Sequence, residues 1–188
     1  MSTRERILDA AAELFWERGF AATSPQAIQA RAGVGQSSMY HHFAGKNALA
    51  AESLRRDGDR LRQSTAALLN AADSPLQAVF DYLTSPRDTS KGCRLGRMTQ
   101  DPEVLADPAL LSPISETFTF YQGRIAALLE SARRDGLLVQ TFSPTDVAAT
   151  IVAIVQGAHV LARAEQSSDA FERVIQGGVQ LLNSLRAR

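Results

Sequence analysis

Three serine–proline pairs open stretches of helical periodicity in this chain, and this feature constrains the fold most. The pairs are Ser24-Pro25, Ser74-Pro75 and Ser143-Pro144. A serine hydroxyl caps free amide groups at a helix start, and proline suits the first helical position because no amide donor is needed there. Sustained alternation of apolar and polar residues, which predicts strands, is nearly absent. The sequence therefore predicts an all-α fold.

Start and stop signals divide the chain into about nine helices. Ser2 and Glu5 have the spacing of a capping box, and Gly19 ends the helix that they open. The later helices are expected at about 25–32, 36–43, 46–71, 75–83, 114–134, 144–164 and 168–185. From 85 to 113 we expect short irregular pieces, because Pro86, Pro102, Pro108 and Pro113 interrupt the periodicity.

Composition indicates a globular protein of one domain, or of one domain with a small addition. The chain has 188 residues, of which 45% are hydrophobic and 21% charged. Its single cysteine, Cys93, excludes an internal disulfide framework. Lys and Arg total 20, as do Asp and Glu, and residues 1–62 hold nine basic against seven acidic side chains. This excess is too small to indicate nucleic-acid binding by charge alone.

Two stretches bear on where the protein resides. The first six residues carry both charge signs and do not have the basic-then-apolar order of an export signal. Residues 147–162 are uncharged, but they fall short of the ~20 residues that a membrane-spanning helix needs. We therefore expect a soluble, cytoplasmic protein with a buried helix at this position.

The two short helices at 25–32 and 36–43 have the spacing of a helix-turn-helix. Gly33 allows the positive φ that the turn between them requires. Ile28 and Met39 are expected to face inward, against Leu14 and Phe15 of the first helix. The second short helix then exposes polar residues at its N-terminus, where a helix in the major groove contacts base edges.

A longer pattern surrounds this motif. It runs Ala11-x-x-Leu14-Phe15-x-x-x-Gly19-Phe20 and then Ile28-x-x-x-Ala32-Gly33-Val34-x-x-x-x-Met39-Tyr40-x-x-Phe43-x-x-Lys46-x-x-Leu49. Over residues 3–50 it resembles the N-terminal domain of TetR-family transcriptional regulators. The resemblance implies a helix-turn-helix DNA-binding domain at 1–46 and a helical bundle for ligand binding and dimerisation at 47–188.

The resemblance also implies which residues contact operator DNA. Phosphates would be bound by Tyr40, by His42 beside His41, and by Lys46. The other expected contacts are Gln36, Ser37 and Ser38 at base edges, Ser24, Pro25 and Gln26 at the backbone, and Thr3 and Arg4 at the flanking backbone. Two residues depart from the pattern: Gln29 stands where the family usually has a small alanine that packs between the helices, and Ser37 stands where glycine is common.

The last two helices have wide apolar faces. Two copies of this pair would form a four-helix bundle across a two-fold axis, which predicts a homodimer. The expected interface residues are Ile151, Ile154, Val155, Ala158, Leu161, Val174, Ile175, Gly178, Leu181 and Leu182. A buried hairpin within one chain is the alternative interpretation.

The predicted partners are thus double-stranded DNA, a second copy of the chain and a small-molecule effector, with no cofactor, metal or membrane. Met98, Phe118, Tyr121 and His159 are candidates to line the effector pocket, although each also fits a plain core position. Cys93 is a candidate oxidant or electrophile sensor, if Lys91 and Arg94 stabilise its thiolate. A helical carrier or an enzyme is the remaining class, but no catalytic motif supports it.

Overall fold

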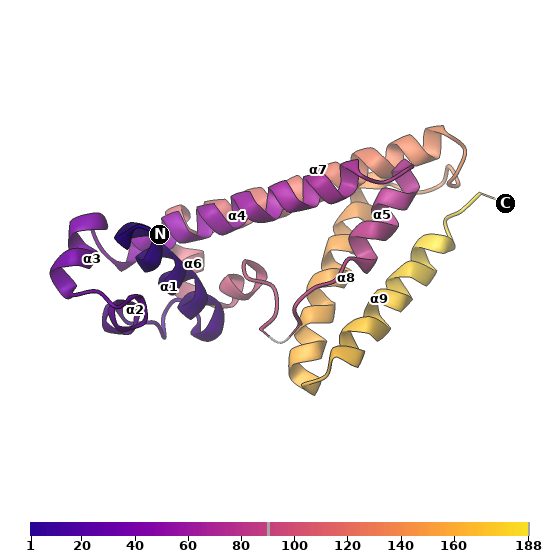
Figure 1. Cartoon of the computed structure of the whole chain (residues 1–188). Coiled ribbons are helices and arrows are strands. Elements are labelled where there is room, and N and C mark those ends of the chain that lie inside the picture. Colours follow the sequence, from indigo (N-terminus) through magenta and orange to yellow (C-terminus); the bar gives the residue numbers. More distant parts are fainter. Residues whose placement is uncertain (90, 188) are drawn as a thin grey trace. The chain divides into compact units, whose positions relative to one another are not determined.

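The computed structural model describes residues 1–89 and 91–187, and these residues form helices joined by short turns (Figure 1). The helices are α1 (Thr3–Arg18), α2 (Pro25–Ala32), α3 (Gln36–His42), α4 (Lys46–Asn70), α5 (Pro75–Thr84), the 3₁₀ helix η1 (Gly96–Gln100), α6 (Pro102–Ala106), α7 (Pro108–Arg134), α8 (Pro144–Glu165) and α9 (Ser168–Asn183). The described part contains no strand beyond one isolated bridge. The all-α prediction is therefore confirmed.

Packing divides the chain into two compact units, neither of which is continuous in sequence. Unit 1 consists of residues 1–60 and 94–116, and unit 2 of residues 61–93 and 117–188. The units therefore do not follow the predicted domains, 1–46 and 47–188, whose boundary stays a prediction.

Unit 1 is built on α1, which contacts α2, α3 and η1. The predicted capping box is present, since Ser2 and Glu5 exchange hydrogen bonds at the start of α1. Ile7, Leu14 and Ile28 are almost fully buried in this unit. Burying such side chains contributes about 1.5–3 kcal/mol each, which makes α1 the support of the two short helices.

Unit 2 has an apolar core to which α5, α8 and α9 contribute. In Figure 1, α8 and α9 run side by side, and both α8 and α5 contact α9. Val79, Ile125 and Ile175 are among the buried residues of this core. Ser74 and Ser143 cap α5 and α8 as predicted, each accepting a hydrogen bond from the amide three residues later.

The predicted start of α7 is wrong. Helix α7 begins at Pro108, whereas the sequence placed its start near Ile114 and treated Pro113 as a break. Asp107 caps the true start, because its carboxylate accepts a hydrogen bond from the Ala109 amide at 2.9 Å. Pro113, the sixth residue of α7, lacks only the amide that would bond the carbonyl of residue 109, so the helix continues through it.

The C-terminal segment leaves α9 at Asn183, two residues before the predicted end. Residues after the helix pair with the turn that follows α7: the Val139 amide donates to the Leu185 carbonyl at 2.8 Å, and the Ala187 amide donates to the Leu137 carbonyl at 3.1 Å. This pairing forms the one isolated bridge of the described chain.

Helix α8 is the one described helix that is long and apolar enough to cross a membrane, by length and composition only. Ala148, Val155 and Ala158 on this helix are buried in the core of unit 2. The core helix of a protein without any membrane span passes the same test, so α8 is no indication of a membrane.

Candidate DNA-binding site

The turn between α2 and α3 is built around one glycine. Gly33 adopts φ +63° and ψ +45°, in the left-handed region that side chains with a Cβ disfavour. Its amide donates to the carbonyls of Ala30 and Gln29, and its carbonyl accepts a hydrogen bond from Arg6 Nη2 at 3.0 Å. Hydrogen bonds at both the amide and the carbonyl of Gly33 therefore fix the turn, and the bond from Arg6 connects it to α1.

Helix α3 presents two different faces. Met39 is completely buried and receives a 3.8 Å hydrogen bond on its sulfur from Gln29 Nε2, which links α2 to α3. Gln36 and Ser37 are exposed at the N-terminus of α3, and Tyr40 is 45% exposed. The structure thus brings the predicted base-contacting residues together on the open face, with Ser38 half-buried at its edge.

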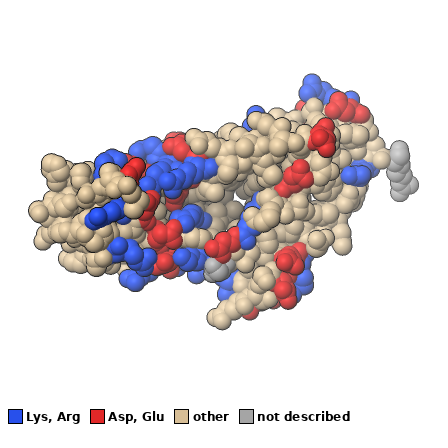
Figure 2. Space-filling model, viewed as in Figure 1, with Lys and Arg blue, Asp and Glu red and all other residues tan. Residues whose placement is uncertain are grey.

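No Lys, Arg, Asp or Glu occurs from residue 32 to residue 45. In Figure 2 the surface over α3 is accordingly uncharged, and basic side chains lie beside it on the same unit. Because α3 carries no carboxylate, it does not repel the phosphates of an approaching polyanion.

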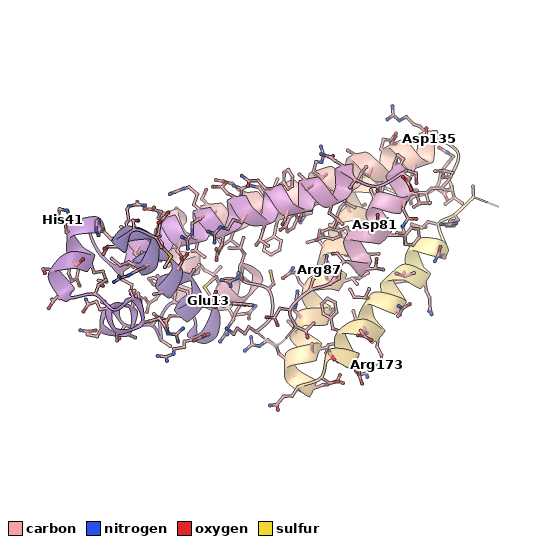
Figure 3. All side chains as sticks on the ribbon, viewed as in Figure 1. Glu13, His41, Asp81, Arg87, Asp135 and Arg173 are labelled. Atoms are coloured by element: carbon pink, nitrogen blue, oxygen red, sulfur yellow. The ribbon has the colours of Figure 1, made fainter. Side chains whose placement is uncertain are left out.

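The histidines and Lys46 lie near the C-terminal end of α3. His41 is exposed on the outer side of the helix, where Figure 3 labels it, and its ring centre is 5.1 Å from that of the half-buried His42. Lys46 opens α4 with its Nζ 4.0 Å from the centre of the Phe20 ring. This cation–π contact positions the ammonium group without neutralising its charge.

The predicted backbone contacts are placed by helix starts. Ser24 is exposed and caps α2 by accepting a hydrogen bond from the Ala27 amide at 3.2 Å. Gln26 is exposed and Pro25 half-buried in the first turn. At the start of α1, Thr3 is half-buried, and Arg4 is exposed but pairs with Glu52 at 2.5 Å. A phosphate contact by Arg4 would therefore compete with an existing ion pair.

The residues predicted for the dimer interface divide into three groups. Ile154 and Val174 are half-buried, whereas Leu161 and Leu181 are 45% and 62% exposed. Val160, which the sequence did not single out, is 63% exposed on α8. The remaining six are buried within their own chain, namely Ile151, Val155, Ala158, Ile175, Gly178 and Leu182. Only the first two groups, with Val160, leave surface for a partner.

The four candidate pocket residues do not gather in one unit. Phe118, Tyr121 and His159 belong to unit 2, and the ring centres of Phe118 and Tyr121 are 6.3 Å apart. Met98 belongs to unit 1, where it lines a cavity of about 10 Å³ beside Phe15. That volume suits one water molecule at most and excludes an effector.

Arg94, which follows Cys93 in sequence, connects η1's segment to α1 and α4 of unit 1. Its guanidinium pairs with Glu13 of α1 and lies 3.6 Å from the buried Asp57 of α4 and 3.9 Å from the centre of the Trp16 ring. Burial raises the pKa of Asp57, and Arg94 is the largest influence that opposes the rise. These groups hold the charge of Arg94 within unit 1.

Helix α3 follows a turn at a glycine, packs inward through Met39 and exposes uncharged polar residues. This arrangement defines the helix-turn-helix class of DNA-binding regulators. Residues 7–52 match the family model "Bacterial regulatory proteins, tetR family", and residues 69–177 match "Tetracyclin repressor-like, C-terminal domain". The chain belongs to the TetR family and is a transcriptional regulator with a DNA-binding helix-turn-helix.

Individual relatives agree with this assignment. The HTH-type transcriptional repressor DhaR of Mycobacterium sp. (strain GP1) is 22% identical over 175 residues, which cover 92% of this chain and 88% of the relative. The HTH-type transcriptional regulator UidR of Escherichia coli (strain K12) is 41% identical over 58 residues, 31% of this chain and 30% of the relative. The crystal structure of a TetR-family regulator from Agrobacterium tumefaciens has a TM-score of 0.86 at 21% identity, with 98% of both chains covered. These are regulators, not enzymes.

Proposed function

We propose that this chain is a cytoplasmic, homodimeric repressor that a small molecule releases from a near-palindromic operator. The open face of α3, with Gln36, Ser37 and Tyr40 exposed and Met39 anchored beneath, is the observation that carries the DNA-binding part. Two copies related by a two-fold axis would place their α3 helices in successive major grooves, and the operator would then share that symmetry.

Dimerisation is supported by apolar side chains that the chain leaves uncovered. Val160 and Leu161 on α8 and Leu181 on α9 are between 45% and 63% exposed. Apolar side chains that a chain leaves exposed on a helix pair are available to a partner. Leu181→Asp should shift the protein from dimer to monomer in light scattering, whereas Leu137→Asp, 40% exposed in the turn after α7, should leave the dimer intact.

The experiment that tests DNA binding is fluorescence anisotropy with DNA from the gene's own upstream region, over a salt series. Tyr40→Ala and Tyr40→Phe separate the ring from the hydroxyl that would contact phosphate. The matched control is Leu137→Ala, an exposed side chain outside the motif. We expect specific binding with a steep salt dependence, weakened by both Tyr40 variants and not by the control.

If the upstream DNA is not preferred over random DNA, selection from a random DNA pool comes next, and its failure would refute the DNA-binding role. The release step requires a coupling of about 1–3 kcal/mol, equivalent to a 5–150-fold loss of operator affinity. A compound that stabilises the protein against heat but leaves operator affinity unchanged would contradict release.

An oxidant or electrophile acting at Cys93 is the second candidate trigger. The observation that favours it is position: Cys93 is a half-buried free cysteine that lies near the charge of Arg87. With no second cysteine in the chain, the product would be a sulfenate, an adduct or a bridge between subunits. Cys93→Ser decides it, because unchanged release under oxidant would end this candidate.

A further inference from the structure

Arg87, in the segment that follows α5, is a partly buried cation whose hydrogen-bond acceptors are all neutral. Nη1 donates to the carbonyls of Leu83 at 3.1 Å and Ser85 at 2.9 Å, and Nη2 donates to the carbonyl of Tyr82. The guanidinium carbon is 5.1 Å from the centre of the Tyr82 ring. These bonds cap the end of α5 and fix the guanidinium, but no carboxylate pairs with it in the described chain.

His159 of α8 lies close enough to Arg87 for the charge of the guanidinium to lower its pKa, and one of its ring nitrogens is unpaired in the described chain. The residue is only 7% exposed, and its Nδ1 is buried without a hydrogen-bond partner among the described residues. Burial, and then the charge of Arg87, lower the pKa of His159 to about 4, so the ring is neutral at pH 7. A buried polar atom without a partner is costly, which suggests that a bound molecule supplies the partner.

Aromatic side chains pack against both groups. The ring centres of Tyr82 and Tyr121 are 5.9 Å apart, and that of Phe171 is 4.9 Å from the imidazole of His159. Burial raises the pKa of Tyr121 to about 12, so its hydroxyl stays protonated and adds no negative charge. In the view of Figure 3, Arg87 is labelled beside α8 and below the end of α5, and these helices carry His159 and Tyr82.

We infer that Arg87 and His159 recognise the carboxylate of an effector whose remaining body is apolar or aromatic. This inference rests on the proposed ligand-responsive function and names the chemical class of the effector. The guanidinium has already lost part of its water in the folded chain, so an arriving carboxylate gains a charge-assisted hydrogen bond without that cost. With its proton on Nδ1, the imidazole donates to the same carboxylate. Asp88, which lies next to Arg87 in sequence, is the acidic group that raises the pKa of His159.

The test measures direct binding to the full-length protein by calorimetry at pH 7.5. The probes are benzoate and hexanoate, each against its neutral amide, benzamide and hexanamide. We expect at least one acid to bind saturably and about tenfold or more tighter than its amide, as hydrogen bonds to charged groups imply. Arg87→Gln should lose about tenfold or more of the affinity for the acid and none for the amide.

The matched control is Arg133→Gln. Arg133 also belongs to unit 2 and also lies over a ring, 5.9 Å from the centre of Phe142, but its charge is paired with Glu130 at 2.5 Å. This variant should bind the acid as the parent does. Arg87→Lys keeps the charge should Arg87→Gln fail to fold, and it should retain a measurable preference for the acid over the amide.

A second readout needs no variant. A bound carboxylate beside His159 should raise the pKa of the imidazole above about 4, which NMR titration with and without benzoate measures. Equal affinity for acid and amide, no binding of either acid at millimolar concentration, or an equal loss in Arg133→Gln would each overturn the inference. Operator binding is measured without any probe, so its result tests the proposed function independently of this inference.

Discussion

His159 makes stability depend on pH in one direction. The folded chain lowers the pKa of this imidazole from 6.5 to about 4, because burial and Arg87 disfavour the charged form. The unfolded chain therefore binds the proton more tightly. Between pH 6.5 and pH 4 each step toward acid favours unfolding, and above pH 6.5 this penalty is absent.

We expect unfolding by urea to show this loss as about 3 kcal/mol between pH 7 and pH 4. His159→Gln should flatten that part of the pH profile without removing the contribution of Asp57. Asp57 acts in the opposite sense, because a raised pKa favours the folded chain as the pH falls. A variant whose profile follows that of the parent would show that folding does not lower the pKa of His159.

Arg94 should contribute more to stability than an exposed arginine does. Arg94→Gln removes the pairing with Glu13 and Asp57 and leaves a buried carboxyl with less compensation. We expect a loss of about 1–3 kcal/mol in the free energy of unfolding. Arg173→Gln is the control, since Arg173 pairs with Glu165 at 2.6 Å but its side chain is 64% exposed. Its effect should stay within about 0.5 kcal/mol, and equal losses would contradict the distinction.

At the scale of single elements, the turn before α3 requires glycine because of its backbone conformation and not because a side chain would lack space. A Cβ at Gly33 would meet only Arg6 Nη2 at 4.0 Å, an ordinary contact, but φ is +63°. Gly33→Ala should cost about 1–2 kcal/mol and weaken operator binding by disturbing α3. Gly35→Ala, at φ −78° and with nothing within 4 Å of an added Cβ, should be nearly neutral. Thermal melts of both variants measure the difference in stability.

The sequence predicted most helices because their starts follow one capping rule. That rule, applied to serine, found the starts of α2, α5 and α8. Applied to Asp101-Pro102 and Asp107-Pro108, it would also have found α6 and the true start of α7, where those aspartates cap. Periodicity is weak in such short segments, so periodicity alone predicts breaks at these prolines, whereas the capping aspartates mark helix starts.

The candidate sites were predictable only where the pattern was local. Tyr40 and Gln36 are exposed as expected, because helical spacing from the inward Met39 places them. Arg87 was missed, since its importance comes from lacking a carboxylate partner, and sequence spacing carries no information on partners distant along the chain. Six dimer candidates are buried within their own chain for a related reason: an apolar stripe does not reveal which side of the helix the chain itself covers.

For the whole molecule, the discontinuous units predict how the protein responds to truncation. Segment 94–116 closes unit 1: the Asp101 carboxylate accepts a 2.7 Å hydrogen bond from the Ala21 amide, and Val104 and Leu110 are completely buried. A fragment of residues 1–60 should therefore lack a cooperative thermal transition in circular dichroism and should not bind the operator. Joining 1–60 to 94–116 through a flexible linker should restore the transition. A cooperative melt of residues 1–60 alone would contradict this.

The chain passes from one unit to the other at three points, near residues 60, 93 and 116. A biosensor engineer who wishes to exchange the sensing half for another cannot do so with a single recombination junction after the helix-turn-helix. Such a graft would separate Arg94 from Glu13 and Asp101 from Ala21. A working chimaera has to take residues 1–60 and residues 94–116 from the same parent. The second of these segments must then be inserted within the sequence of the new sensing half.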